Sequence, residues 1–138
     1  LDVPQRRTML ENIMTTVPLS DVHYIDTTVL PDKLEWFART PDLVWTMDWL
    51  RKTSENPKAA PVRGILSINP GVDVNTTTWK FVGYKGGSET GVLNMTYLLQ
   101  HSSGDWYGLS VSWLRTDAAV DLLSFSGIVE RAIQLIAP

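Results

Sequence analysis

The chain has 138 residues, of which 43% are hydrophobic and 20% charged, which is enough apolar side chain for the core of one domain over residues 1–138. Twelve Lys and Arg against fifteen Asp and Glu give a net charge of −3, which argues against proteins that bind nucleic acids or anionic membranes. The absence of cysteine excludes disulfides, thiolate zinc sites and a cysteine nucleophile, and His23 and His101 are too few for a histidine-based metal cluster unless carboxylates complete it. No apolar run reaches the roughly 18 residues of a membrane-spanning helix, so we expect no membrane span. We also expect no cofactor.

The first predicted element is a helix that Pro18 ends. Asp2 is suited to the N-cap, and Gln5, three residues later, completes the pattern of a capping box. Apolar residues then recur with the helical period and form one stripe that we expect to be buried: Leu10, Ile13, Met14 and Val17. Residues 18–40 have no helical period, so we expect an ordered loop with three apolar anchors: Leu34, Trp36 and Phe37.

A second helix is predicted from Thr40, its N-cap, to the Asn56-Pro57 pair that closes it, with Pro41 at the first helical position. Its buried stripe is expected to contain Leu43, Met47 and Leu50, widened by Val44, Trp45 and Trp49. Asn69-Pro70-Gly71 then predicts a turn in which Gly71 has a positive φ.

The apolar period changes to two at Trp79, which predicts three β-strands over about 79–85, 91–101 and 105–115. Gly86-Gly87 interrupts the first, and the second is almost continuously apolar, as a central strand buried on both faces would be. Short connections predict an antiparallel meander in chain order. A helix over about 118–137 completes an α+β fold, with a predicted buried stripe of Leu122, Phe125, Val129, Ala132, Ile133 and Ile136.

The most informative segment is Lys85-Gly86-Gly87-Ser88, which the pattern places at the end of the first strand. Two glycines let another molecule approach the backbone closely and leave N–H groups accessible. A lysine beside accessible N–H groups is what stabilisation of an anion or oxyanion requires. A tight hairpin with a solvated lysine has the same spacing. The residues by themselves therefore leave both interpretations open, an anion-stabilising site and a simple turn.

Lys85-Gly86-Gly87, on the strand before a long buried strand, a further strand and a C-terminal helix, resembles the Lys-Thr-Gly element of class A β-lactamases and related penicillin-recognising serine hydrolases. The segments 34–38, 61–63 and 68–71 resemble other blocks of a β-lactamase-like group, and the resemblance is strongest from about Trp36 to Asp117. It implies the C-terminal part of a β-lactamase/transpeptidase-like fold, acyl transfer on a small-molecule ester or amide, and an extracytoplasmic location.

The resemblance also implies roles for single residues. Lys85 would be the active-site lysine that sets the electrostatic field around the nucleophile and the substrate carboxylate. Ser88 would offer its backbone N–H as half of the oxyanion hole, and Gly87 would keep the strand edge open. Gly86 stands where the usual motif has Thr or Ser, so a hydroxyl that would bind a β-lactam carboxylate is missing. That difference favours some other ester or amide substrate.

The family's nucleophile lies in Ser-x-x-Lys, and no serine of this chain has Lys three residues on. Thr77-Thr78-Trp79-Lys80 has the spacing with threonine but leads into a strand, whereas the family places its nucleophile at a helix start. Ser20-Asp21-Val22 has Val where the family's Ser-Asp-Asn has an amide. Both motifs precede Lys-Thr-Gly in the family, and this chain begins without Met, so we expect an N-terminal portion with the nucleophile to be absent.

Two consequences follow for activity and partners. The 138 residues alone should have no hydrolase activity, and their exposed apolar surface should be covered in a homodimer or by the missing N-terminal portion. The alternative hypothesis is a non-catalytic module that keeps the same fold to bind a ligand or a partner.

Overall fold

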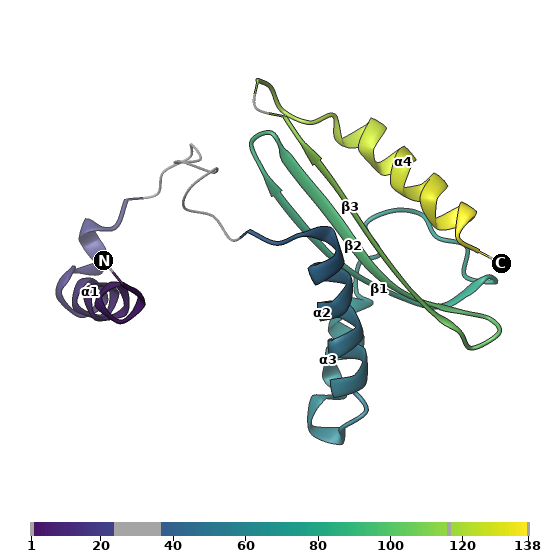
Figure 1. Ribbon diagram of the computed structural model, residues 1–138, viewed down its shortest axis with the longest axis horizontal. Coiled ribbons are helices and arrows are strands. Elements are labelled where there is room, and N and C mark those ends of the chain that lie inside the picture. The colour runs from purple at the N-terminus through teal and green to yellow at the C-terminus, as the bar shows by residue number, and fades with distance from the viewer. Residues whose placement is uncertain (1, 24–36, 116, 138) are drawn as a thin grey trace.

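The computed structural model describes residues 2–23, 37–115 and 117–137 (Figure 1). Its antiparallel sheet has the strand order β1-β2-β3, with β1 at Trp79–Glu89, β2 at Val92–His101 and β3 at Trp106–Leu114. The α-helices are α1 (Val3–Thr16), α2 (Thr40–Thr53), α3 (Pro61–Leu66) and α4 (Leu122–Leu135). The α+β class and the meander order predicted from the sequence are confirmed.

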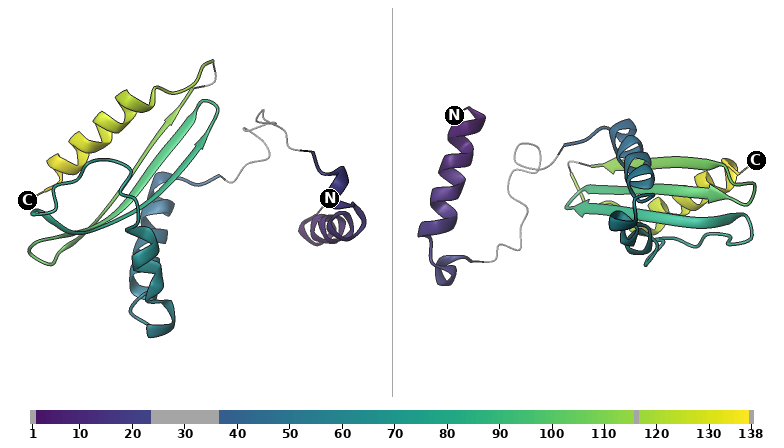
Figure 2. Two further views of the ribbon diagram at one scale, coloured as in Figure 1. Left: turned by 180° about the vertical axis from the view of Figure 1, so that it is seen from behind. Right: turned by 90° about the horizontal axis from the view of Figure 1, so that it is seen from below.

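The sheet is covered by α4 on one face and, in part, by α2 and α3 on the other (Figure 2). On the α4 face, Tyr97 and Leu99 of β2 pack with Phe125, Val129 and Ile133 of α4 in one buried cluster. Residues 95–99 of β2 are all buried, which confirms the prediction of a central strand covered on both sides. Asp121 begins α4 as its N-cap, with its carboxylate accepting a hydrogen bond from the Leu123 N–H at 3.0 Å.

On the opposite face, Met47 of α2, Leu66 of α3 and Leu98 of β2 form a second, smaller cluster. Phe81 and Trp106 pack at its border, and their ring centroids are 5.6 Å apart. From Leu98 toward the start of β2, the side chains on this face become polar, beginning with Thr96. The two helices therefore cover one part of the face with apolar residues and leave the part beside Lys85 to polar ones.

A β-bulge changes which face each residue of β1 occupies. Pairing with β2 shifts register between Trp79 and Phe81, so Trp79 packs in the α4 cluster and Phe81 in the α2–α3 cluster. The period of two that begins at Trp79 would place these two rings on one face. That expectation is wrong at this point, because the extra residue of a bulge reverses the alternation.

The first helix forms where the sequence predicts it, but its packing differs. The Asp2–Gln5 capping box is present, with the Gln5 N–H donating to the Asp2 carboxylate at 2.8 Å. The expected buried stripe is wrong, because no residue of α1 is buried and the whole stripe is exposed: Leu10, Ile13, Met14 and Val17. In Figures 1 and 2, α1 stands apart from the sheet, so its apolar side has no described element to pack against.

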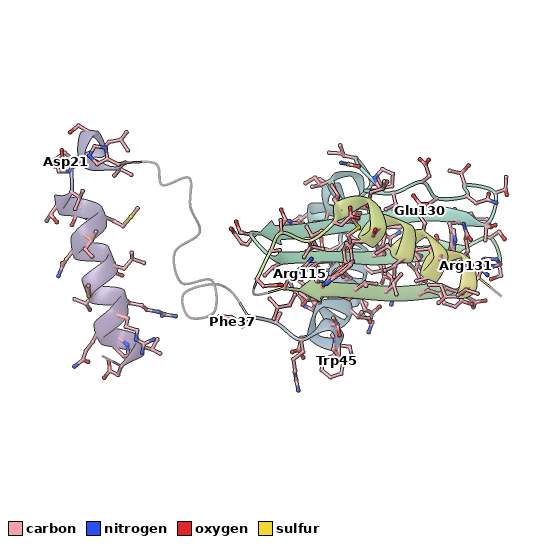
Figure 3. All side chains as sticks on the ribbon, turned by 90° about the horizontal axis from the view of Figure 1, so that it is seen from above. Asp21, Phe37, Trp45, Arg115, Glu130 and Arg131 are labelled. Carbon is pink, nitrogen blue, oxygen red and sulfur yellow. The ribbon has the colours of Figure 1, made fainter. Side chains whose placement is uncertain are left out.

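In α2 the predicted burial is correct for the centre of the apolar stripe and wrong for its margin. Met47 is buried, whereas Trp45 and Trp49 are 67% and 61% exposed, and Figure 3 shows Trp45 on the outer side of the helix. Thr40 is the first residue of the helix and not its cap; Arg39 precedes it and pairs with Asp42. The side of the helix that the sheet covers is too narrow to include either tryptophan.

The remaining differences concern boundaries and loop residues. Helix α4 is shorter at both ends than the predicted 118–137, and Leu122, expected in its buried stripe, is exposed. Helix α3 was not predicted, since its six residues are too few to show a period. Gly71 has the expected positive φ, at 72°. Of the three predicted loop anchors, Phe37 is exposed, and Leu34 and Trp36 lie outside the described residues.

Candidate functional site

The segment singled out in the sequence lies inside β1 and not at its end. Gly86 is paired with Met95, Gly87 with Asn94 and Ser88 with Leu93, so the strand continues through both glycines to Glu89. The chain reverses later, at Thr90 and Gly91. Gly91 has a φ of 79°, and a Cβ there would lie 2.2 Å from the Arg115 carbonyl oxygen, so this position requires glycine.

β1 is an edge strand: in the described sheet it has β2 on one side and no strand on the other. Two residues connect β1 to β2 in a hairpin. In such a hairpin the last pair before the connection, here Glu89 with Val92, exchanges both backbone hydrogen bonds. Along an antiparallel ladder such pairs alternate with pairs that share no backbone hydrogen bond. Ser88 and Gly86 therefore belong to the other type of pair, and their N–H and C=O groups face the open edge.

Lys85 is paired with Thr96 of β2, which lies between Leu98 and Asn94 on the face of the sheet that α2 and α3 cover in part. Lys85 therefore lies on the same face. Its side chain is exposed and bends toward the open edge, where the ammonium donates a hydrogen bond to the Gly86 carbonyl oxygen. The positive charge thus lies beside the edge-facing backbone groups of the glycine pair.

A polar network covers β2 and β3 next to Lys85. Thr96 Oγ1 donates to Asn94 Oδ1 at 2.9 Å and lies 2.9 Å from the Ser110 hydroxyl. Asn94 Nδ2 donates in turn to Ser112 Oγ at 2.8 Å and to the Val111 carbonyl oxygen at 3.2 Å. Thr96 is 3% exposed, so these bonds satisfy a buried hydroxyl and hold the Asn94 amide in one orientation.

Tyr84 reaches the glycine pair from the opposite, α4-covered face. An ideal Cβ on Gly86 would lie 2.1 Å from the Tyr84 hydroxyl oxygen, so that oxygen occupies the space of a side chain at position 86. A Cβ on Gly71 would lie 2.7 Å from Tyr84 Cζ, and the Tyr84 and Tyr97 ring centroids are 5.1 Å apart. The ring is therefore held on several sides, and burial raises the pKa of its hydroxyl.

These groups border one groove of about 610 Å³. Its lining includes all four residues predicted from the sequence, Lys85, Gly86, Gly87 and Ser88, so the structure brings them together. Sequence reasoning missed the other lining residues, of which Tyr84 and Asn94 could have been found from the strand register: Ile65, Ile68, Asn69, Tyr84, Leu93, Asn94, Met95 and Leu122.

The chemistry available in the groove is binding and charge stabilisation. Its described lining contains a cation, amides, two hydroxyls and apolar side chains, but no His, Asp or Glu that could take a proton from Ser88. Within the described ranges, no three His, Asp or Glu side chains gather as a metal ion would require. Likewise, no described helix is long and apolar enough to cross a bilayer.

Comparison with known proteins adds no relative: no family model matches the sequence, and no curated protein matches it. The β-lactamase-like resemblance of the Lys85 strand therefore remains a prediction.

Proposed function

We propose that this chain is the C-terminal portion of a β-lactamase-like serine hydrolase, which transfers an acyl group from a small-molecule ester or amide. The observation that supports the proposal is the open edge of β1, where the Lys85 ammonium lies beside the edge-facing N–H groups of Gly86 and Ser88. Attack on a carbonyl places negative charge on its oxygen, and fixed donors at that place lower the barrier.

In this proposal the nucleophilic serine and its base come from a portion outside the 138 residues. The serine oxygen adds to the substrate carbonyl, and the resulting oxyanion accepts a hydrogen bond from the Ser88 N–H. The leaving group departs with the proton that the base has taken from the serine hydroxyl. Water then gives a proton to the same base and hydrolyses the acyl-enzyme, which releases the acid and restores the serine. Lys85 supplies positive charge at the edge throughout, and it stabilises the oxyanion or a substrate carboxylate bound beside it.

The test compares two lysines of β1 in the complete protein that the gene encodes. Lys85→Ala removes the cation from the groove, and we expect a roughly hundredfold loss of kcat/KM for an activated ester, because one charged donor is worth about 3 kcal/mol in such a site. Lys80→Ala is the matched control, since Lys80 is also exposed on β1 but does not line the groove. Both variants should keep the wild-type melting temperature.

Two results would contradict the proposal. Turnover that is equal in the Lys85→Ala and Lys80→Ala proteins would remove Lys85 from the active site. A complete protein that hydrolyses no ester or amide, and whose upstream sequence contains no Ser-x-x-Lys, would favour the non-catalytic binding module.

A further inference from the structure

Three polar groups meet at Gly86, each from a different direction. The Lys85 ammonium reaches the Gly86 carbonyl oxygen from the face that α2 and α3 cover in part. The Tyr84 hydroxyl approaches Gly86 from the α4 face, within 2.1 Å of where a Cβ would be. The Gly86 N–H faces the open edge between them.

The Tyr84 hydroxyl is oriented by packing and makes no hydrogen bond to another residue that the structure describes. Gly71 and Tyr97 restrict the ring, so the position of its oxygen is determined by packing. Tyr84 is partly buried and lines the groove, and no hydrogen bond joins its hydroxyl to another described residue, so the oxygen is accessible to a ligand there. A tyrosine hydroxyl is protonated near neutral pH at its ordinary pKa, and burial raises the pKa of this one further, so it is available as a donor.

We propose that the Tyr84 hydroxyl is a ligand-binding group of this site, which donates a hydrogen bond to a carboxylate that the Lys85 ammonium also attracts. The inference rests on the proposed function and names a specificity-determining residue for it. Gly86 has no hydroxyl of its own, and Tyr84 places one in the space that a side chain there would fill. Exposed Ile65, Ile68 and Leu122 in the same groove suit a ligand that also carries an apolar part.

The experiment measures binding by the 138-residue chain and needs no turnover. N-acetylglycine, which carries an amide and a carboxylate, is titrated into the ¹⁵N-labelled chain while the amide resonances of Gly86, Gly87 and Ser88 are followed. Tyr84→Phe keeps the ring and removes the oxygen, and we expect it to weaken binding about tenfold, as loss of a hydrogen bond to a charged group does. Tyr107→Phe, which removes a hydroxyl outside the groove, should bind as the wild type does.

A second measurement uses the wild-type chain, so it does not depend on the fold of a variant. With ¹³C at tyrosine Cζ, N-acetylglycine should shift the Tyr84 resonance and leave that of Tyr107 in place. An unshifted Tyr84 resonance, equal affinity in Tyr84→Phe, or no response of Gly86, Gly87 and Ser88 in the wild type would each overturn the inference. Absence of turnover in the complete protein would count against the proposed hydrolase and leave this binding result intact.

Discussion

Replacing Gly86 with serine should destabilise the protein, although the Lys-Thr-Gly element that this segment resembles usually has Thr or Ser at this position. The new Cβ would lie 2.1 Å from the Tyr84 hydroxyl oxygen and 2.8 Å from Cζ. A flexible side chain could move away from such a contact, but the Tyr84 ring is itself in contact with Gly71 and Tyr97. Either the ring or the β1 backbone must shift, and overpacking of this kind costs about 1–3 kcal/mol.

The neighbouring glycine provides the control. A Cβ on Gly87 meets nothing within 4 Å, and its φ is not positive, so Gly87→Ser should change the free energy of unfolding by no more than about 0.5 kcal/mol. Urea unfolding of both variants, followed by tryptophan fluorescence, compares the two neighbouring substitutions directly. A Tyr84→Ala/Gly86→Ser double variant should show a strongly non-additive free energy, because removing the ring removes the clash.

The reasoning is refuted if Gly86→Ser is as stable as Gly87→Ser. It is refuted equally if the Gly86→Ser loss persists at full size in the Tyr84→Ala background, since the contact with the ring would then not be its cause.

Three further predictions concern the core, the acid stability and the activity of the isolated chain. Phe125→Ala should lower the free energy of unfolding by about 3–5 kcal/mol in urea, because Phe125 is 1% exposed, whereas Leu123→Ala, at an 83% exposed position, should have little effect. The pKa of Asp121 is lowered, chiefly by a hydrogen bond from the Ser124 hydroxyl, so its stabilising contribution is present above the ordinary pKa of Asp and is lost as pH falls through the lowered value. Asp121→Ala should therefore reduce the melting temperature near neutral pH and reduce it less in acid, where the Asp121 carboxyl becomes protonated; an equal loss at both pH values would contradict this. The purified 138-residue chain should not hydrolyse p-nitrophenyl acetate, and turnover that Ser88→Ala abolishes would show that the chain carries its own nucleophile.

The strands and the last helix could be predicted from the sequence because side-chain burial follows the backbone period directly. Phe125, Val129 and Ile133 recur at helical spacing and are all buried. Periodicity reports which side of an element is apolar, but not what covers it. For that reason the helix at Val3–Thr16 was predicted correctly while the burial of its stripe was not, since no described element packs on it.

The candidate site was found from the sequence only in part. Lys85 to Ser88 all line the groove, while their catalytic and oxyanion roles stay predictions, and Gly86-Gly87 was interpreted as a break because glycine is rare in strands. Glycine can still pair in a ladder, and the true turn follows at Gly91, where the neighbouring carbonyl leaves no room for a side chain. Ending the strand at 85 hid the relation between Tyr84 and Gly86, which are two residues apart on one face.

The Tyr84 ring has a consequence for how this sequence can change over evolution. One aromatic side chain occupies the space of two others, since both Gly71 and Gly86 would carry a Cβ within 3 Å of it. Positions 84 and 86 are therefore not independent, and a side chain can enter at 86 only when residue 84 becomes smaller, whereas the positive φ at 71 favours glycine there whatever residue 84 is. Homologous sequences should divide into two groups, one with tyrosine at 84 and glycine at 86, and one with a small residue at 84 and Ser or Thr at 86. A hydroxyl would then be kept beside the lysine in both groups, supplied by a different residue in each.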